Sequence, residues 1–497
     1  MKKGCKKFFS QLLTVFLILF CSGIIFSSII YLKSPYADEI QAGLNFRMGM
    51  IFLFLYTIYI ISAWQICKKA SDKILRILEI AAFAWLTAAL SLIAIFMQLI
   101  PIVDLSHIYD QVTEMIANRS IFFSDDYYFG FYTNNIPLAI LIYWIFALGH
   151  SLGIENFRLI GGLFNVICIV IAVYFIYKLA FDLYGKRHAA FTLLILISNP
   201  MLYAYGSYYY TDMVSLPFLS AGVYYLMSPR FSMTERRIHH QWIFGAILIA
   251  IAAKLRITSI FIIPALAAAL VFHKKWKQLV LSILNIFIGF LIVQILYLSI
   301  YHLQVPFETR DSAVVFTHFL MMGSQGSGIY DEADVEFTRS LPTHKEKIEN
   351  TLRIFRERIQ KNGLYGNLHL ILQKEFQVWG IGSHSYREYT EFVTQKNPIY
   401  LVLRGDKSGY FLNYCYAYNI MLMILIILSL ISDFRSHDLL SDTLKWYFFG
   451  AILFYMIWES HPRHAVCFLF ILVLLAGKIL PFKEILPLTT VNKTDKL

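Results

Sequence analysis

Residues 9–32 read FSQLLTVFLILFCSGIIFSSIIYL, a run without a charged side chain. At 1.5 Å per residue, a helix of this length extends about 36 Å, which exceeds the roughly 30 Å hydrocarbon core of a bilayer. Similar runs recur along all 497 residues, and the chain is 58% apolar and 15% charged with a mean hydropathy of +0.60. A soluble domain averages about 25% charged residues. The sequence therefore predicts an all-α polytopic membrane protein with about 12 transmembrane helices.

The basic residues fit a membrane protein better than a nucleic-acid-binding one. The net charge is +11, but Lys and Arg stand in short loops between apolar runs, where they set orientation. The N-terminal run continues to Tyr31 without a convincing cleavage site, which favours an uncleaved signal-anchor. The six cysteines form no CxxC motif and lie in or beside apolar runs. They are interpreted as small core residues rather than as a disulfide framework or a zinc site.

The charge pattern also predicts a path across the membrane. Because basic loops stay inside, both termini are expected in the cytoplasm of a multi-pass cell-membrane protein. Ten single crossings satisfy this rule, at 9–32, 48–66, 77–101, 158–178, 188–204, 213–227, 278–301, 410–432, 444–458 and 464–480.

For two further apolar segments, the sides on which their ends lie decide whether the segment crosses the membrane an odd or an even number of times. Residues 242–272 have basic loops at both ends, so we expect a hairpin of two short helices whose tip contains Lys254 and Arg256. Residues 136–151 start and end outside, so we expect an interfacial helix there. The alternative makes each segment a single crossing, but it leaves two basic loops outside and ranks second.

These crossings divide the chain into four parts. Residues 1–76 contribute two N-terminal transmembrane helices, and 77–301 form a transmembrane module with an outer loop at 102–157. Residues 302–409 form a large outer loop, with helical periodicity around 344–361 that stops at Gly363. Residues 410–497 hold the C-terminal helices and a cytoplasmic tail. Short outer tips are expected at 205–212 (YGSYYYTD) and 459–463 (ESHPR).

Asp104 directly follows a predicted span and opens an amphipathic helix. Leu105, Ile108, Val112, Met115 and Ile116 recur on one face at helical spacing. The helix would lie on the outer leaflet and hold Asp104 at the membrane boundary. An aspartate here can simply cap the helix, so the cap and catalyst interpretations are evenly balanced on this residue alone.

Ionisable groups gather at the other outer tips as well. Asp212 stands beside the short span 213–227, where an aspartate is costly unless it is exposed or paired. It is a second candidate catalytic residue, and it could otherwise cap the following helix. Lys254 and Arg256 would face a cavity or bind an anion, or else extend to the headgroups. Further candidates for substrate binding are Tyr109, Tyr132, Asn134, Asn135, Glu459, His461 and Arg463.

Carboxylates and cations on the outer face suit one kind of chemistry. Sugar nucleotides are absent outside the cell, so a transferase there needs a donor carried by the membrane, such as a polyprenyl-phosphate sugar. Its departing phosphate calls for Arg or Lys, and its acceptor hydroxyl calls for a carboxylate base. Two rival functions are a lipid-linked polysaccharide polymerase or ligase and a non-enzymatic flippase or transporter; the latter favours inverted repeats, which the sequence does not display.

Several segments, in order, resemble the GT-C glycosyltransferases. They are VDLSHIYDQV at 103–112, FYTNN at 131–135, YYYTDMVSLPF at 208–218, KLRITSIFIIPALAA at 254–268, THFLMMGSQGSGIYDEADV at 317–335 and WESHPRH at 458–464. The likeness is to family 39-like, mannosyltransferase-type membrane proteins of Gram-positive bacteria and covers about residues 77–480. The chain departs from the pattern at 130–133, where an arginine is usual, and at His464, where tyrosine is common.

The resemblance implies roles for particular residues. Asp104 matches the base that acts on the acceptor, Asp212 matches a second-loop acidic position, and Arg463 matches an arginine that contacts the carrier phosphate. The loop with Met321, Met322 and Gly323 would cover the site. The expected protein is an inverting hexosyltransferase whose site faces outside, whose acceptor is a cell-envelope glycan, glycolipid or protein, and which needs neither a metal nor another cofactor.

Overall fold

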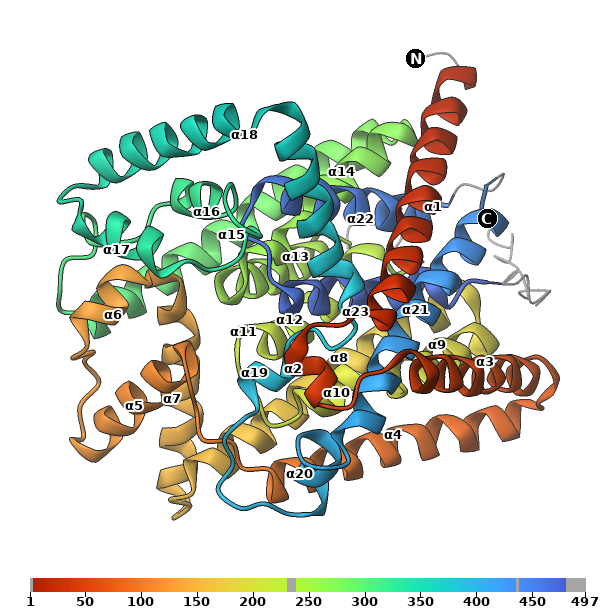
Figure 1. Ribbon diagram of the computed structural model, residues 1–497, viewed down its shortest axis with the longest axis horizontal. Coiled ribbons are helices and arrows are strands. Elements are labelled where there is room, and N and C mark those ends of the chain that lie inside the picture. Colours follow the sequence, from red (N-terminus) through yellow and green to blue (C-terminus); the bar gives the residue numbers. More distant parts are fainter. Residues whose placement is uncertain (1–2, 230–237, 435–437, 480–497) are drawn as a thin grey trace, which may run out of the picture.

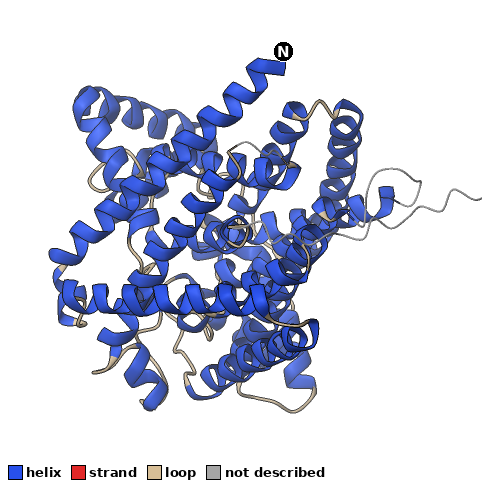
Figure 2. Cartoon of the chain, turned by 90° about the vertical axis from the view of Figure 1, so that its right-hand side faces the viewer, coloured by secondary structure: helices blue, strands red, loops and turns tan. Residues whose placement is uncertain are grey.

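The computed structural model describes residues 3–229, 238–434 and 438–479, and these residues are helical apart from their connections (Figure 1). Figure 2 shows no strand in the described chain, where pairing is limited to one isolated antiparallel bridge between Leu99 and Val393. The all-α class expected from the apolar runs is therefore confirmed.

Six helices in the described ranges are long and apolar enough to cross a membrane. Much of their outward surface is apolar and exposed, as expected for side chains that face lipid. They are α1 (Lys3–Lys33, searched from Phe8), α3 (Phe46–Lys69), α4 (Asp72–Phe96), α8 (Phe157–Tyr184), α15 (Trp276–Gln304) and α21 (Ser408–Ser432).

The other apolar runs form shorter helices separated by irregular backbone. For example, the predicted crossing 188–204 breaks at Pro200, and the run 213–227 begins with a single turn before Pro217. Irregular backbone at membrane depth is tolerated where protein covers it. The shorter helices are α7 (Ile136–Ser151), α9 (Lys186–Ile197), α10 (Pro200–Ala204), α11 (Thr211–Val214), α12 (Leu216–Met227), α13 (Ile238–Leu255), α14 (Ile262–Phe272), α22 (Leu439–Ile457) and α23 (Ala465–Ala476).

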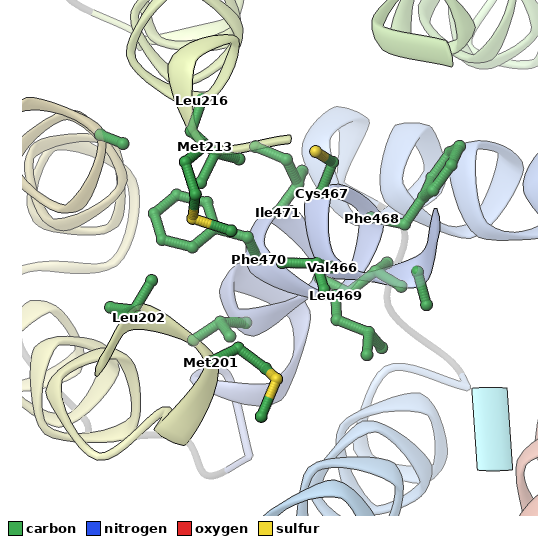
Figure 3. Close-up of a cluster of buried hydrophobic side chains, with 14 of the residues drawn as sticks. Met201, Leu202, Met213, Leu216, Val466, Cys467, Phe468, Leu469, Phe470 and Ile471 are labelled. Carbon is green, nitrogen blue, oxygen red and sulfur yellow. The ribbon is translucent and has the colours of Figure 1, made fainter. Parts of the chain in front are cut away.

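Helix α23 lies in the centre of the molecule. All twelve of its residues are buried, and its side chains pack against residues from α10, α11 and α12 (Figure 3). Met201 and Met213 fill the space beside Phe470 in this cluster. A helix that is apolar on every side belongs either in a protein core or in lipid, and the burial of α23 places it in the core, where it anchors the preceding segment, residues 458–464.

The segment expected as a hairpin, 242–272, forms two short helices. The chain breaks between them at the predicted tip, where Arg256 is extended and a 3-10 turn (Ile257–Phe261) follows. Helix α13 packs mainly against α12 and α15, and α14 packs mainly against α22 and also contacts α15. The break carries Lys254 and Arg256 into the interior of the protein.

The regions that the charge pattern places outside contain further, mostly short helices. The predicted amphipathic helix is α5 (Asp104–Ala117), with Leu105, Ile108, Val112 and Met115 buried. It packs on α7, which extends only about 24 Å, less than a bilayer core. The other helices are α2 (Ala37–Gln41), α6 (Asp126–Phe131), η1 (Thr133–Asn135), α16 (Phe316–Met322), α17 (Glu332–Ser340), α18 (His344–Gly380), α19 (Tyr386–Tyr389), α20 (Pro398–Leu403) and η4 (Pro462–His464).

Helices α16, α17 and α18 form a cover over one end of the molecule (Figure 1). Helix α18 bends at Gly363, whose φ is +61°, so the predicted stop at this glycine is confirmed. The Lys374 ammonium fastens the cover by donating to the carbonyls of Gly323 (2.8 Å) and Met456 (3.2 Å). The cover is thus attached to residues 456–460, beside the candidate site.

Candidate functional site

Several helix interruptions meet at one place in the interior. The non-helical stretch 205–210, the break at Arg256 and the segment 458–464 contribute the polar groups. The Tyr205 hydroxyl donates to the carbonyl of His384 (2.6 Å), and His384 Nδ1 lies 3.1 Å from the carbonyl of Pro462. Side chains that belong to separate outer tips in the sequence are therefore neighbours in space.

Asp212 lies between two arginines. Its carboxylate is fully buried, with Oδ1 2.6 Å from Arg256 Nη1 and Oδ2 3.1 Å from Arg463 Nε. Both guanidinium groups are about nine-tenths buried as well. A buried carboxylate is tolerated when cations compensate its charge. One anion between two cations leaves a net positive charge, and this charge favours an anionic ligand.

Asp104 is held by two tyrosine hydroxyls. Tyr128 donates to Oδ1 (2.7 Å) and Tyr210 to Oδ2 (2.9 Å). Asn135 joins both tyrosines, because its amide nitrogen donates to Tyr128 (2.7 Å) and its oxygen lies 3.0 Å from the Tyr210 hydroxyl. Burial, followed by the charge of Asp104, raises the pKa of both tyrosines. They remain protonated and available as donors.

These four side chains form a closed ring of four contacts. With Asp104 ionised, the ring contains three protons that can bridge them: one from each tyrosine and one from the amide. The count is the same if the amide of Asn135 is turned over. A proton taken up by Asp104 would supply the fourth bond, since Asp104 could then donate to Tyr210 and Tyr210 to Asn135. The arrangement thus suits a carboxylate that accepts a proton.

The backbone before Asp104 is strained. Val103 has φ of +53° and ψ of −136°, a region that a β-branched residue rarely adopts. Such outliers persist where the surrounding structure determines them, and they cluster at functional sites. The strained residue directs Asp104 at the start of α5 toward the two tyrosines.

Tyr210 and Arg463 connect the two aspartates. The Arg463 guanidinium lies 5.0 Å from the Tyr210 ring centre and 4.1 Å from that of Tyr389, and it donates to the Tyr208 hydroxyl (3.1 Å). Such cation–π contacts favour a fixed guanidinium orientation. Asp104, Tyr210, Arg463 and Asp212 therefore form one continuous polar array.

A cavity of about 1090 Å³ opens beside this array. Most of its wall is apolar and comes from α13, α15 and α22, with Phe316 and Phe319 from the cover. Lys254, Arg256, Arg310, His464 and Glu459 supply ionisable groups. The Lys254 ammonium lies 4.4 Å from the ring centre of Tyr297, and within the described ranges none of the ion pairs includes Lys254. The cavity thus suits a long apolar molecule with an anionic group.

Glu459 lines the cavity and is close enough to Asp104 for their charges to interact. Its carboxyl lines the cavity, and its pKa is raised to about 7, first by burial and further by the charge of Asp104 against the opposing effect of Arg463. Its backbone N–H donates to the carbonyl of Phe319 (3.1 Å), which fixes the residue beneath the cover.

The raised pKa of Glu459 predicts a pH dependence of stability. The folded protein holds this proton up to about pH 7, whereas an unfolded glutamate loses it near pH 4.3. Stability contributed by the group is thus present below about pH 4.3 and is lost as pH rises through 7. We expect the melting temperature of the wild type to fall relative to that of Glu459→Gln between pH 5 and pH 8. Parallel melting curves for the two proteins would contradict this.

The structure brings together most of the residues singled out in the sequence. Tyr132 lies 5.2 Å, ring to ring, from Tyr128, and Asn134 lines the cavity. His461 turns away from it: Nε2 lies 3.2 Å from Glu388, and Nδ1 accepts from the backbone N–H of Arg463. Tyr109 is separate and packs on Phe146, under Arg158.

Sequence reasoning missed Tyr128, Tyr210 and Tyr389 as parts of the array. The first two lie in segments already recognised as aromatic, DDYYFGFY and YGSYYYTD. The signal that could have found them is the run of tyrosines beside a buried carboxylate, because a buried carboxylate needs donors. Arg339, from the cover, is likewise unforeseen; its guanidinium lies 4.1 Å from the Tyr127 ring centre and 4.7 Å from that of Phe131.

The fold and the site define an all-helical integral membrane protein with an ion-paired polar array and an amphipathic cavity. The chain belongs to the family described as "conserved hypothetical integral membrane protein", whose model matches residues 2–481. A solved structure, ArnT from Cupriavidus metallidurans bound to undecaprenyl phosphate, is distantly similar: the identity is 12%, the TM-score 0.36, and the match covers 80% of this chain and 77% of that one. No curated protein matches the chain.

Proposed function

We propose that this protein is a GT-C-type glycosyltransferase that moves a sugar from a polyprenyl-phosphate carrier to an acceptor hydroxyl at the outer face of the membrane. The observation that carries the proposal is the 1090 Å³ cavity, whose wall combines an apolar surface with Lys254 and Arg256 and also includes Glu459. A carrier with an isoprenoid chain and a phosphate has the same two-part character.

In this proposal, Lys254 and Arg256 bind the phosphate of the donor. Among the described residues no carboxylate forms an ion pair with Lys254, and Arg256 and Arg463 share Asp212. Guanidinium groups bind phosphate oxygens in a forked geometry, and an ammonium acts as a point charge. Asp212 is a positioning residue in this proposal, because its carboxylate is occupied by the two arginines.

The proposed reaction is a single displacement. Asp104 takes the proton of the acceptor hydroxyl as that oxygen forms a bond to the anomeric carbon. The bond from this carbon to the phosphate oxygen breaks, and the carbon is inverted. The polyprenyl phosphate leaves with the bonding electron pair, and Lys254 and Arg256 stabilise the negative charge that develops. Tyr132 and Asn134 would contact the sugar.

The test uses purified full-length protein in lipid nanodiscs with a panel of radiolabelled polyprenyl-phosphate sugars, mannosyl included, and cell-envelope extract. Transfer to extract material supports the proposal and identifies the donor. Movement of the labelled lipid between leaflets without transfer would favour a flippase. Elongation of a lipid-linked glycan with Asp104→Asn fully active would favour a polymerase or ligase.

Transfer is expected to continue after metal ions are removed. The positive charge for the leaving monophosphate comes from Lys254 and Arg256 in this proposal, so EDTA should leave the rate within about twofold. Lys254→Gln should instead lower it by about 10- to 100-fold, because a charge-assisted contact made to the departing phosphate is lost. A rate abolished by EDTA and restored by Mg²⁺ would contradict this assignment of the charge.

A further inference from the structure

A second, separate cavity lies on the other side of α19 from the polar array of Asp104, Tyr210, Arg463 and Asp212. It has a volume of about 660 Å³ and is enclosed by the turn after α2, by α20 and by the first turn of α21. The two cavities have no lining residue in common among the described residues. Helix α19 separates them: Tyr389 lies under Arg463, and Glu388 contacts His461, whereas Arg387 lines the second cavity.

The lining of the second cavity is predominantly cationic. Arg387, Lys396 and Arg404 line it, against a single lining carboxylate, Asp406. Arg404 Nη2 lies 3.6 Å from Glu391 Oε2, but the side chain of Glu391 is 53% exposed. An exposed ion pair of this kind contributes little to stability. Burial and then the neighbouring Arg387 lower the pKa of Arg404. Both guanidinium groups thus belong to one cavity wall and are close enough for their charges to interact.

The dipole of α21 adds positive potential to the same cavity. Helix α21 has 25 residues, and its N-cap, Lys407, provides no side-chain cap. Its positive dipole end therefore opens on the cavity, where Ser408 and Gly409 are part of the wall. Arg387 Nη1 donates to Ser408 Oγ at 3.0 Å, which fixes the guanidinium beside the helix end. A Cβ on Gly409 would lie 3.1 Å from Gly43 Cα, so the wall is rigid backbone.

We propose that this cavity binds a phosphate group, either as the headgroup of an anionic phospholipid or as a free phosphate. Two arginines in the wall of one cavity suit the oxygens of a tetrahedral anion, which accept forked hydrogen bonds. Tyr400, Leu401 and Tyr410 form the less polar part of the wall, against which a glycerol or acyl segment can lie. The site is independent of the transfer reaction proposed above.

The test measures binding with full-length protein in nanodiscs. One arm uses radiolabelled inorganic phosphate with phosphatidylcholine nanodiscs. The other uses native mass spectrometry after exposure to mixed phosphatidylglycerol and phosphatidylcholine vesicles. The variant is the double substitution Arg387→Gln with Arg404→Gln. The matched control is Arg353→Gln with Arg356→Gln, which removes the same charge from exposed positions on α18.

We expect the wild type and the control to bind one of the two probes and the site variant to bind it about tenfold more weakly. Binding of phosphatidylglycerol alone identifies a lipid headgroup, and binding of inorganic phosphate identifies a free anion. If the double variant melts early, Arg404→Lys replaces it; this variant keeps the charge but loses the fork, so binding should weaken by a few fold. Binding of neither probe, or equal binding by the wild type and the site variant, would overturn the proposal.

Discussion

Replacement of Asp104 by asparagine is expected to lower the rate of sugar transfer by about 10²- to 10⁴-fold, the range attributed to general base catalysis. Asparagine has nearly the same shape and can still bond to Tyr128 and Tyr210, which hold the aspartate at 2.7 and 2.9 Å. It cannot take the acceptor proton. The measurement is initial-rate transfer from the labelled carrier identified in the donor panel.

The control for this variant is Asp110→Asn. Asp110 lies on the same helix, α5, but its side chain is exposed and faces away from the ring. We expect its transfer rate to stay within about twofold of the wild type. If Asp104→Asn retains the wild-type rate at an unchanged melting temperature, Asp104 is not the base.

A third variant tests the contribution of the Tyr210 hydroxyl, which holds the proposed base, separately from that of the base itself. Tyr210→Phe removes a contact to Asp104 and another to Asn135 but leaves the carboxylate in place. We expect a smaller loss, about tenfold, because Asp104 keeps its carboxylate but loses one of the two hydroxyls that orient it. A transfer rate equal to that of the wild type would show that the Tyr210 hydroxyl does not support the base.

Replacement of Asp212 by alanine is expected to lower the free energy of unfolding by about 3–5 kcal/mol, the cost of breaking a buried ion pair by removing one partner. Arg256 and Arg463 would be left facing each other without an anion, and both are about nine-tenths buried. The melting temperature in detergent measures the effect, and low yield of folded protein would accompany it.

The matched control for Asp212→Ala is Glu357→Ala. Glu357 forms a 2.9 Å pair with Arg353, but both side chains are more than half exposed. An exposed pair of this kind contributes about 0–1 kcal/mol, so the melting temperature should barely change. The double substitution Asp212→Ala with Arg256→Met should recover part of the lost stability, since it removes one uncompensated charge. An Asp212→Ala protein as stable as the wild type would show that the ion pairs of Asp212 with Arg256 and Arg463 do not stabilise the fold.

The sequence by itself determined that this protein is all-helical and that several of its helices are long and apolar enough to span a membrane. The run at 9–32 is one of them, because its length and apolar composition suffice to cross a bilayer core. The face of α5 with Leu105 and Ile108 followed from helical spacing, and the bend at Gly363 followed from its conformational freedom. These features depend on residues close together in the chain, so local periodicity contains them.

The tertiary structure alone decided which polar residues meet. Asp212 appeared in the sequence as a possible helix cap or catalyst, but its partners Arg256 and Arg463 come from distant helix interruptions. The two short helices expected at 242–272 followed from the sequence, but their main partners did not, because α13 packs chiefly on α12 and α15 and α14 chiefly on α22. Hydrophobic periodicity records that a face is buried, whereas the identity of its partner depends on packing between segments far apart in the chain.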